Sequence, residues 1–112
     1  MARAATTSDA FNAIAEPQRR EILGLLRFGE RPVTDLARDL GMTQPQASKH
    51  LRVLRDAGLV RVEQRAQRRI YAVDARPMAE LDRWLAPYRR LWNRSLDDLG
   101  RHLDAHPEEE KR

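Results

Sequence analysis

The 112-residue sequence contains no cysteine, few aromatic residues and no long apolar run. Without cysteine it has no disulfide, no thiolate metal ligand and no cysteine nucleophile. No run of about 18 apolar residues is present, so no membrane-spanning helix is expected. The first seven residues lack the apolar segment of a signal peptide, which predicts a cytoplasmic protein without a membrane partner. A chain of this length accommodates one domain.

The net charge of +4 is concentrated in one stretch. Residues 44–69 hold seven basic and two acidic side chains, a net charge of +5, so the remainder carries −1. Such a block of positive charge is typical of a surface that binds a polyanion. DNA or RNA is the first candidate for this partner, and anionic lipid is the second. The alternative is a solvated basic face without a partner.

Apolar residues three and four positions apart predict four helices in the first half of the chain. The first helix is expected to be capped by Thr7 or Ser8 and to stop at Glu16, because the residue before a proline is pushed out of the helical region. The others are expected over residues 17–28, 32–40 and 44–57. Pro32 opens the third, and the fourth buries a stripe made of Ala47, Leu51 and Leu54.

Alternating polar and apolar residues over 59–65 and 69–73 predict two strands, joined by a basic turn at residues 66–68. A long helix starts between Asp74 and Pro77, with apolar residues spaced as in a coiled-coil seam and a kink or break expected at Pro87. The expected fold is mainly α with a small β-hairpin, in the order α-α-α-α-β-β-α. Residues 8–104 form one domain, and residues 1–7 and 105–112 are expected to be disordered.

The third and fourth helices meet at Leu40–Thr43 in the layout of a helix-turn-helix, in which the second helix enters the DNA major groove. At 100° per residue, the side opposite the buried stripe carries polar and basic side chains near the helix start. Glutamine can pair with adenine, serine with any base, and lysine or arginine with guanine or phosphate. The alternative is an ordinary amphipathic helix. The outward residues are Gln44, Gln46, Ser48, Lys49 and Arg52.

Basic residues also gather at the tip of the hairpin. The cluster consists of Arg65, Gln67, Arg68 and Arg69. Arginines on a β-ribbon tip suit a minor groove or the flanking phosphates. The alternative is an exposed turn with solubilising charge.

The segment TQPQASKHLRVLRDAGLV, residues 43–60, resembles the recognition-helix signature of the ArsR (arsenical-resistance repressor) family. EPQRREIL, residues 16–23, is similar to the opening of that family's second helix, and RIY, residues 69–71, matches its wing, so the resemblance covers about residues 8–104. It implies a homodimeric winged helix-turn-helix repressor that a signal releases from its operator. It also implies DNA contacts from the recognition helix, with wing arginines on flanking DNA.

The resemblance also implies a DNA contact by His50. Thr43, the residue that opens the recognition helix, is predicted to belong to the same DNA-binding site. Because His50 lies on the edge of the buried stripe, a packed boundary histidine is an equal alternative. The resemblance further implies a dimer built from the first and last helices. The residues expected in this interface are Phe11, Ile14, Leu81, Leu85, Tyr88, Trp92, Leu99 and Leu103.

The sequence departs from the family's metal sensors. Pro32 and Thr34 stand where those proteins carry two cysteines, so the thiolate site cannot form. His102 and His106 are four residues apart, but a solvated pair is favoured over a metal site, and we expect no metal or cofactor. Ala66 occupies a wing position where relatives often have glycine, and a turn with positive φ would penalise it.

The sequence therefore predicts a sequence-specific regulator of transcription that binds double-stranded DNA, a homodimeric repressor of an inverted-repeat operator with an unknown effector. The alternative is a protein-interaction module that acts through the last helix. RNA binding is less favoured, because stacking aromatics are missing from the basic stretch. The sequence contains no phosphate-binding glycine loop or nucleophile elbow, so an enzyme is not expected.

Overall fold

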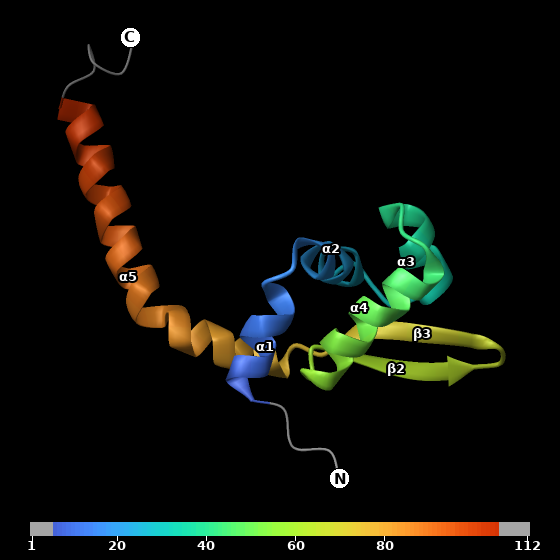
Figure 1. The fold of residues 1–112 in the computed structure, drawn as a ribbon. Coiled ribbons are helices and arrows are strands. Elements are labelled where there is room, and N and C mark those ends of the chain that lie inside the picture. The colour runs from blue at the N-terminus through green and yellow to red at the C-terminus, as the bar shows by residue number, and fades with distance from the viewer. Residues whose placement is uncertain (1–5, 106–112) are drawn as a thin grey trace. The chain divides into compact units, whose positions relative to one another are not determined.

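A computed structural model describes residues 6–105. Most of the two predicted disordered ends, residues 1–5 and 106–112, lies outside the described residues. The chain divides into two units, one up to Leu81 and one from Asp82, and each is described by itself. The elements of the first unit are α1 (Thr7–Ile14), α2 (Pro17–Leu26), β1 (Arg31–Pro32), α3 (Val33–Leu40), α4 (Gln44–Asp56), β2 (Val60–Arg65) and β3 (Arg68–Val73), followed by the start of α5 (Arg76–Ala105; Figure 1). The predicted mainly helical fold with a β-hairpin is confirmed.

The first helix starts earlier than predicted. Thr6 is its N-cap: the Thr6 hydroxyl accepts from the backbone N–H of Asp9 at 3.3 Å, and the Asp9 carboxylate accepts from the N–H of Thr6 at 2.9 Å. This capping box satisfies two backbone donors that a helix start leaves without partners. Thr6 and Thr7 therefore belong to the folded unit, and the predicted cap at Thr7 or Ser8 is wrong.

Two consecutive arginines attach α1 to α2. The Nε of Arg19 donates to the carbonyl of Ala13 at 2.6 Å, and Nη1 of Arg20 donates to the carbonyl of Ile14 at 2.9 Å. These carbonyls belong to the last turn of α1, where backbone acceptors have no partner within the helix. Glu16 caps α2 and Pro17 occupies its first position, so the predicted boundary between the two helices is confirmed.

The core of the first unit lies under α4. Its predicted stripe, Ala47, Leu51 and Leu54, is completely buried together with Ile22 of α2 and Leu36 of α3. Complete burial of leucine and isoleucine side chains contributes about 1.5–3 kcal/mol each relative to exposure. Packing on several neighbouring elements therefore fixes which face of α4 remains in solvent.

The sheet has three strands rather than the predicted two, in the order β1-β3-β2. β1 pairs antiparallel with β3, with Arg31 opposite Tyr71 and Pro32 opposite Ile70. Pro32 therefore ends a short edge strand and serves as the N-cap of α3, which begins at Val33 rather than at Pro32. A two-residue strand is too short to show alternation, and its proline is tolerated because edge strands leave some N–H groups unpaired.

The hairpin closes with a two-residue turn at Ala66 and Gln67, between the paired Arg65 and Arg68. Ala66 has a φ of +53°, the conformation that disfavours any residue with a Cβ. The turn therefore has the positive φ for which the sequence analysis expected a penalty at Ala66.

Of the two outcomes predicted at Pro87, a kink or a break, the break is wrong, because α5 is continuous through this residue. A proline removes one backbone hydrogen bond from a helix, and in α5 the helical conformation continues on both sides of it. In the second unit, Trp84 and Tyr88 lie one turn apart with ring centroids separated by 4.9 Å. No helix within residues 6–105 is both long and apolar enough to cross a lipid bilayer.

Replacing Gly41 by alanine should lower the free energy of unfolding by about 1 kcal/mol, because Gly41 ends α3 with a φ of +66° and no atom lies within 4 Å of an added Cβ. Gly24→Ala is the matched control. It also meets nothing within 4 Å, but it lies inside α2 and should stabilise the protein by about 0.5–1 kcal/mol. Urea titrations followed by circular dichroism measure both, and equal effects would refute the role of backbone conformation.

Candidate DNA interface

The turn between α3 and α4 sets how the two helices cross. Gly41 takes the left-handed conformation, and the N–H of Met42 donates back to the carbonyl of Ala37 at 2.9 Å. Met42 is 9% exposed and belongs to the core. The turn therefore has both the glycine and the apolar contact that usually end a helix.

Thr43 opens α4 with a second capping box. Its hydroxyl accepts from the N–H of Gln46 at 3.2 Å, and Oε1 of Gln46 accepts from the N–H of Thr43 at 2.9 Å. Gln46 is thus a capping residue as well as a predicted base reader. The Thr-x-x-Gln spacing that signals this box is visible in the sequence, but the sequence analysis missed it.

The predicted recognition residues are mostly exposed. Gln44, Gln46, Lys49 and Arg52 are open to solvent, and Ser48 is half-buried beside the core stripe. The structure therefore brings the predicted polar and basic side chains to the outward side of α4. Their contacts with DNA stay a prediction.

His50 is a boundary residue. It is half-buried, and its Nε2 lies 3.0 Å from Oε1 of Gln18 on α2. A hydrogen bond between these atoms joins α4 to α2. His50 therefore packs at the boundary between the two helices, and its contact with DNA stays a prediction.

The wing is the hairpin of β2 and β3, and its polar residues differ in what they contact. Gln67 and Arg68 are exposed at the tip, and the guanidinium of Arg69 lies 5.8 Å from the ring centroid of Tyr71. Arg61, which the predicted site did not include, donates from Nη1 to the carbonyl of Val73 at 3.1 Å.

Arg65 is paired with two carboxylates. The two terminal guanidinium nitrogens, Nη1 and Nη2, contact the carboxylate of Glu30, with Nη2 3.1 Å from Oε2. Nη2 also lies 2.8 Å from Oε2 of Glu63. Hydrogen bonding to Arg65 lowers the pKa of Glu30, and hydrogen bonds to Glu30 and Glu63 raise the pKa of Arg65. The three groups together carry a charge of −1. Sequence reasoning missed Glu30, because it lies 35 positions from Arg65.

The predicted dimer residues fall into two groups. Phe11 and Ile14 are half-buried against the core, and Leu81, only 4% exposed, is part of it and has little surface left for a partner. The remaining residues lie on α5, where Leu103 is half-buried. The large apolar side chains of α5 that are 39–61% exposed are Trp84, Leu85, Tyr88, Leu91, Trp92, Leu96 and Leu99.

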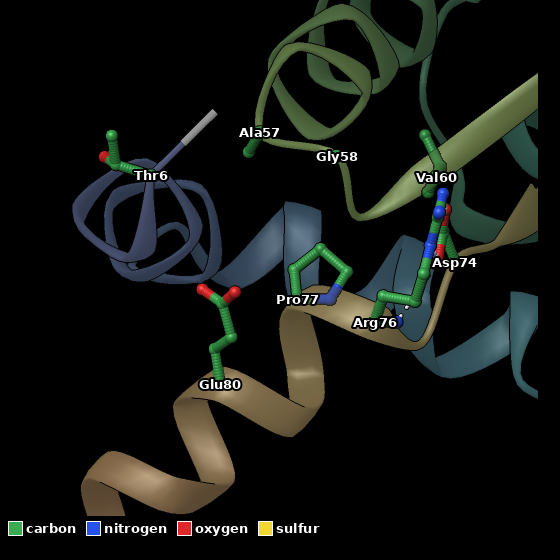
Figure 2. Close-up of a pocket in the computed structure, with 8 residues that line it drawn as sticks. All are labelled: Thr6, Ala57, Gly58, Val60, Asp74, Arg76, Pro77 and Glu80. Carbon is green, nitrogen blue, oxygen red and sulfur yellow. Dashed lines mark hydrogen bonds and ion pairs between the residues drawn. The ribbon is translucent and has the colours of Figure 1, made fainter. Parts of the chain in front are cut away.

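A pocket of about 320 Å³ lies between the start of α1, the end of α4 and the start of α5 (Figure 2). Asp74 and Arg76 face each other on one side of it, with Nε of Arg76 3.0 Å from Oδ1 of Asp74. Hydrogen bonds from Arg76 lower the pKa of Asp74 to about 2, so the pair is ionised at neutral pH. Glu80, at the start of α5, and Thr6, before α1, line the other side.

No group of three histidine, aspartate or glutamate side chains within residues 6–105 has the arrangement of a metal site. His102 lies in the last turn of α5. His106, the other member of the predicted pair, lies outside the described residues.

Comparisons with known proteins agree on the class. The family model for bacterial regulatory proteins of the arsR family matches residues 16–62, from the cap of α2 into β2. The chain is 36% identical over 96 residues to the HTH-type transcriptional regulator Rv2034 of Mycobacterium tuberculosis, covering 86% of this chain and 87% of that protein. The protein is thus a transcriptional regulator with a winged helix-turn-helix DNA-binding domain. The chain belongs to the arsR family of bacterial regulatory proteins.

Two further similarities concern function and assembly. The chain is 28% identical over 78 residues to the transcriptional repressor SdpR of Bacillus subtilis, covering 70% of this chain and 87% of that protein. It also resembles the solution structure of the homodimeric winged helix-turn-helix DNA-binding domain of Mb0332 from Mycobacterium bovis. That match has a TM-score of 0.59 and 29% identity, and covers 77% of each chain.

Thr43→Ala should lower the free energy of unfolding by about 1 kcal/mol, because the first turn of α4 loses its cap. Gln46→Glu should change it by less than about 0.5 kcal/mol, since a glutamate can accept the same N–H of Thr43. Gln44→Ala is the control on the first residue of α4, outside the capping box. Denaturant titrations measure all three, and an unchanged Thr43→Ala variant would exclude a stabilising cap.

Proposed function

We propose that this protein is a homodimeric repressor that recognises an inverted-repeat operator in double-stranded DNA. The observation that carries this proposal is the orientation of α4, whose apolar face is buried and whose polar face is exposed at its N-terminal half. The basic wing belongs to the same folded unit. Together they provide one element for the major groove and one for flanking DNA.

In the proposed complex, the start of α4 lies in the major groove. Gln44, Gln46 and Ser48 read base edges, and Lys49 and Arg52 bind guanine or phosphate. For Gln46 to pair with both groups of adenine, its Oε1 would have to leave the N–H of Thr43, to which it is bonded in this structure. Base recognition by Gln46 therefore competes with the cap.

The wing contributes mainly sequence-independent affinity. Arg68 and Gln67 are exposed at the turn, and Arg69 lies beside them. Arginine side chains at such a tip bind phosphates or a narrow minor groove. Because phosphate binding releases counterions, the affinity should fall steeply as the salt concentration rises.

The exposed apolar face of α5 supports a homodimer. Seven large apolar side chains lie on it, and contiguous patches of this kind mark interaction surfaces. The Mycobacterium bovis neighbour is described as a homodimer. Pairing two chains would present two α4 helices about 34 Å apart, one turn of DNA, to two half-sites.

The repressor role is supported by the similarity to SdpR, which is named a repressor. A repressor blocks transcription while bound and needs a signal for release. Because Pro32 and Thr34 occupy the positions of the family's cysteine pair and the chain has no cysteine, that signal is not a metal bound to such thiolates. The proposed place of action is the cytoplasm, where bacterial DNA lies.

The first test separates phosphate contacts from base contacts. Arg68→Ala should weaken an operator duplex and an unrelated duplex by the same factor, and should reduce the salt slope by about 0.9 for each wing. Gln46→Glu, which keeps the cap, should instead change the preference at one base pair by about 5- to 150-fold. Fluorescence anisotropy over a range of salt concentrations measures both, on a duplex identified by footprinting the upstream region of the gene. Unchanged binding by both variants would refute this docking.

The second test concerns the dimer. Trp92→Glu should convert the protein to a monomer in sedimentation equilibrium, because it places a charge on the apolar face of α5. Phe28→Glu is the matched control: Phe28 is 71% exposed, but lies outside α5, and its replacement should leave the dimer intact.

The same apolar face would serve the alternative function, a protein-interaction module acting through α5. A wild-type chain that is monomeric and shows no salt-sensitive binding to duplex DNA would favour that alternative over the proposed repressor.

A further inference from the structure

The carboxylate of Glu30 holds Arg65 at the wing in a two-point contact. Nη1 and Nη2 of Arg65 each meet one oxygen of Glu30. A DNA phosphate also offers two acceptor oxygens to a guanidinium, and arginine binds carboxylates and phosphates with this same fork geometry. Glu30 thus occupies the donors that Arg65 would present to a DNA backbone.

The pair lies where exchange is possible. The side chains of Arg65 and Glu30 are 48% and 47% exposed, so solvent and ions reach both. Exposed ion pairs of this kind are weak and are screened by salt. Arg65 also forms the last β2 pair with Arg68 before the turn, so it lies next to the proposed phosphate contacts.

We propose that Glu30 competes with DNA phosphates for Arg65 and thereby sets the affinity of the wing for the DNA backbone. This inference rests on the proposed function, because it requires the wing to approach DNA. In the free protein Arg65 is neutralised by Glu30 and Glu63. On DNA, Arg65 transfers its donors to a phosphate, and the remaining carboxylates oppose the approach of the backbone. Glu30 therefore lowers affinity for every duplex, whatever its sequence.

The test measures duplex binding by Glu30→Gln. The variant should bind operator and unrelated duplex about two- to fivefold more tightly at low salt, the range expected when an exposed ion pair no longer competes. Its salt slope should steepen by up to about 0.9 for each wing, because the wing that meets the DNA backbone carries one negative charge fewer. Glu80→Gln is the matched control. It removes the same negative charge, but from a residue that lines the pocket at the start of α5 rather than from a partner of Arg65.

A double-mutant cycle assigns the effect to Arg65. In an Arg65→Ala background, Glu30→Gln should act no more strongly than Glu80→Gln. An affinity gain that survives in this background would overturn the proposal. A loss of affinity in Glu30→Gln would also overturn it, since Glu30 would then support the shape of the wing. Thermal unfolding checks that each variant is folded. If Glu30→Gln does not fold, Glu63→Gln replaces it and should also raise the affinity for duplex DNA.

Failure of the proposed function gives a different result. In that case the wild-type protein and Arg68→Ala bind duplex DNA equally, with no dependence on salt. If Arg68→Ala weakens binding but Glu30→Gln matches Glu80→Gln, DNA binding stands and only the competition for Arg65 is refuted.

Discussion

Burial of the face of α4 formed by Ala47, Leu51 and Leu54 determines which side of this helix is exposed to solvent. These side chains pack into a core shared with other helices of the first unit. At 100° per residue, an apolar face fixed in the core leaves the opposite side in solvent. That side carries Lys49 and Arg52, so hydrophobic packing sets the direction of the polar and basic groups.

Three local features around α4 keep the helix in this orientation. Gly41 turns the chain in the left-handed conformation, Thr43 caps the new helix, and His50 bonds to Gln18 on α2. One of these features, the cap of α4, uses a side chain that also belongs to the proposed DNA surface. Gln46 completes the cap, so the residue proposed to read a base also stabilises the helix that positions it.

The arginines of the wing are alike in the sequence, but they have different partners in the structure. Of the arginines in the wing, Arg65 is held by two carboxylates, Arg69 lies over the ring of Tyr71, and Arg61 bonds to the carbonyl of Val73. A cluster of positive residues in the sequence therefore divides into groups with different partners. Exposed Arg68, at the turn, remains the simplest candidate for a phosphate contact.

The sequence by itself determined the order of the helices, the hairpin and the outward face of α4, because periodicity and capping signals are local. It also predicted the penalty at Ala66, now seen as a positive φ. Only the tertiary structure decided that Pro32 pairs with Ile70 in a third strand, that Leu81 joins the core and that Glu30 meets Arg65. The physical reason is sequence separation: such contacts form only when packing brings distant segments together, and no local pattern marks them.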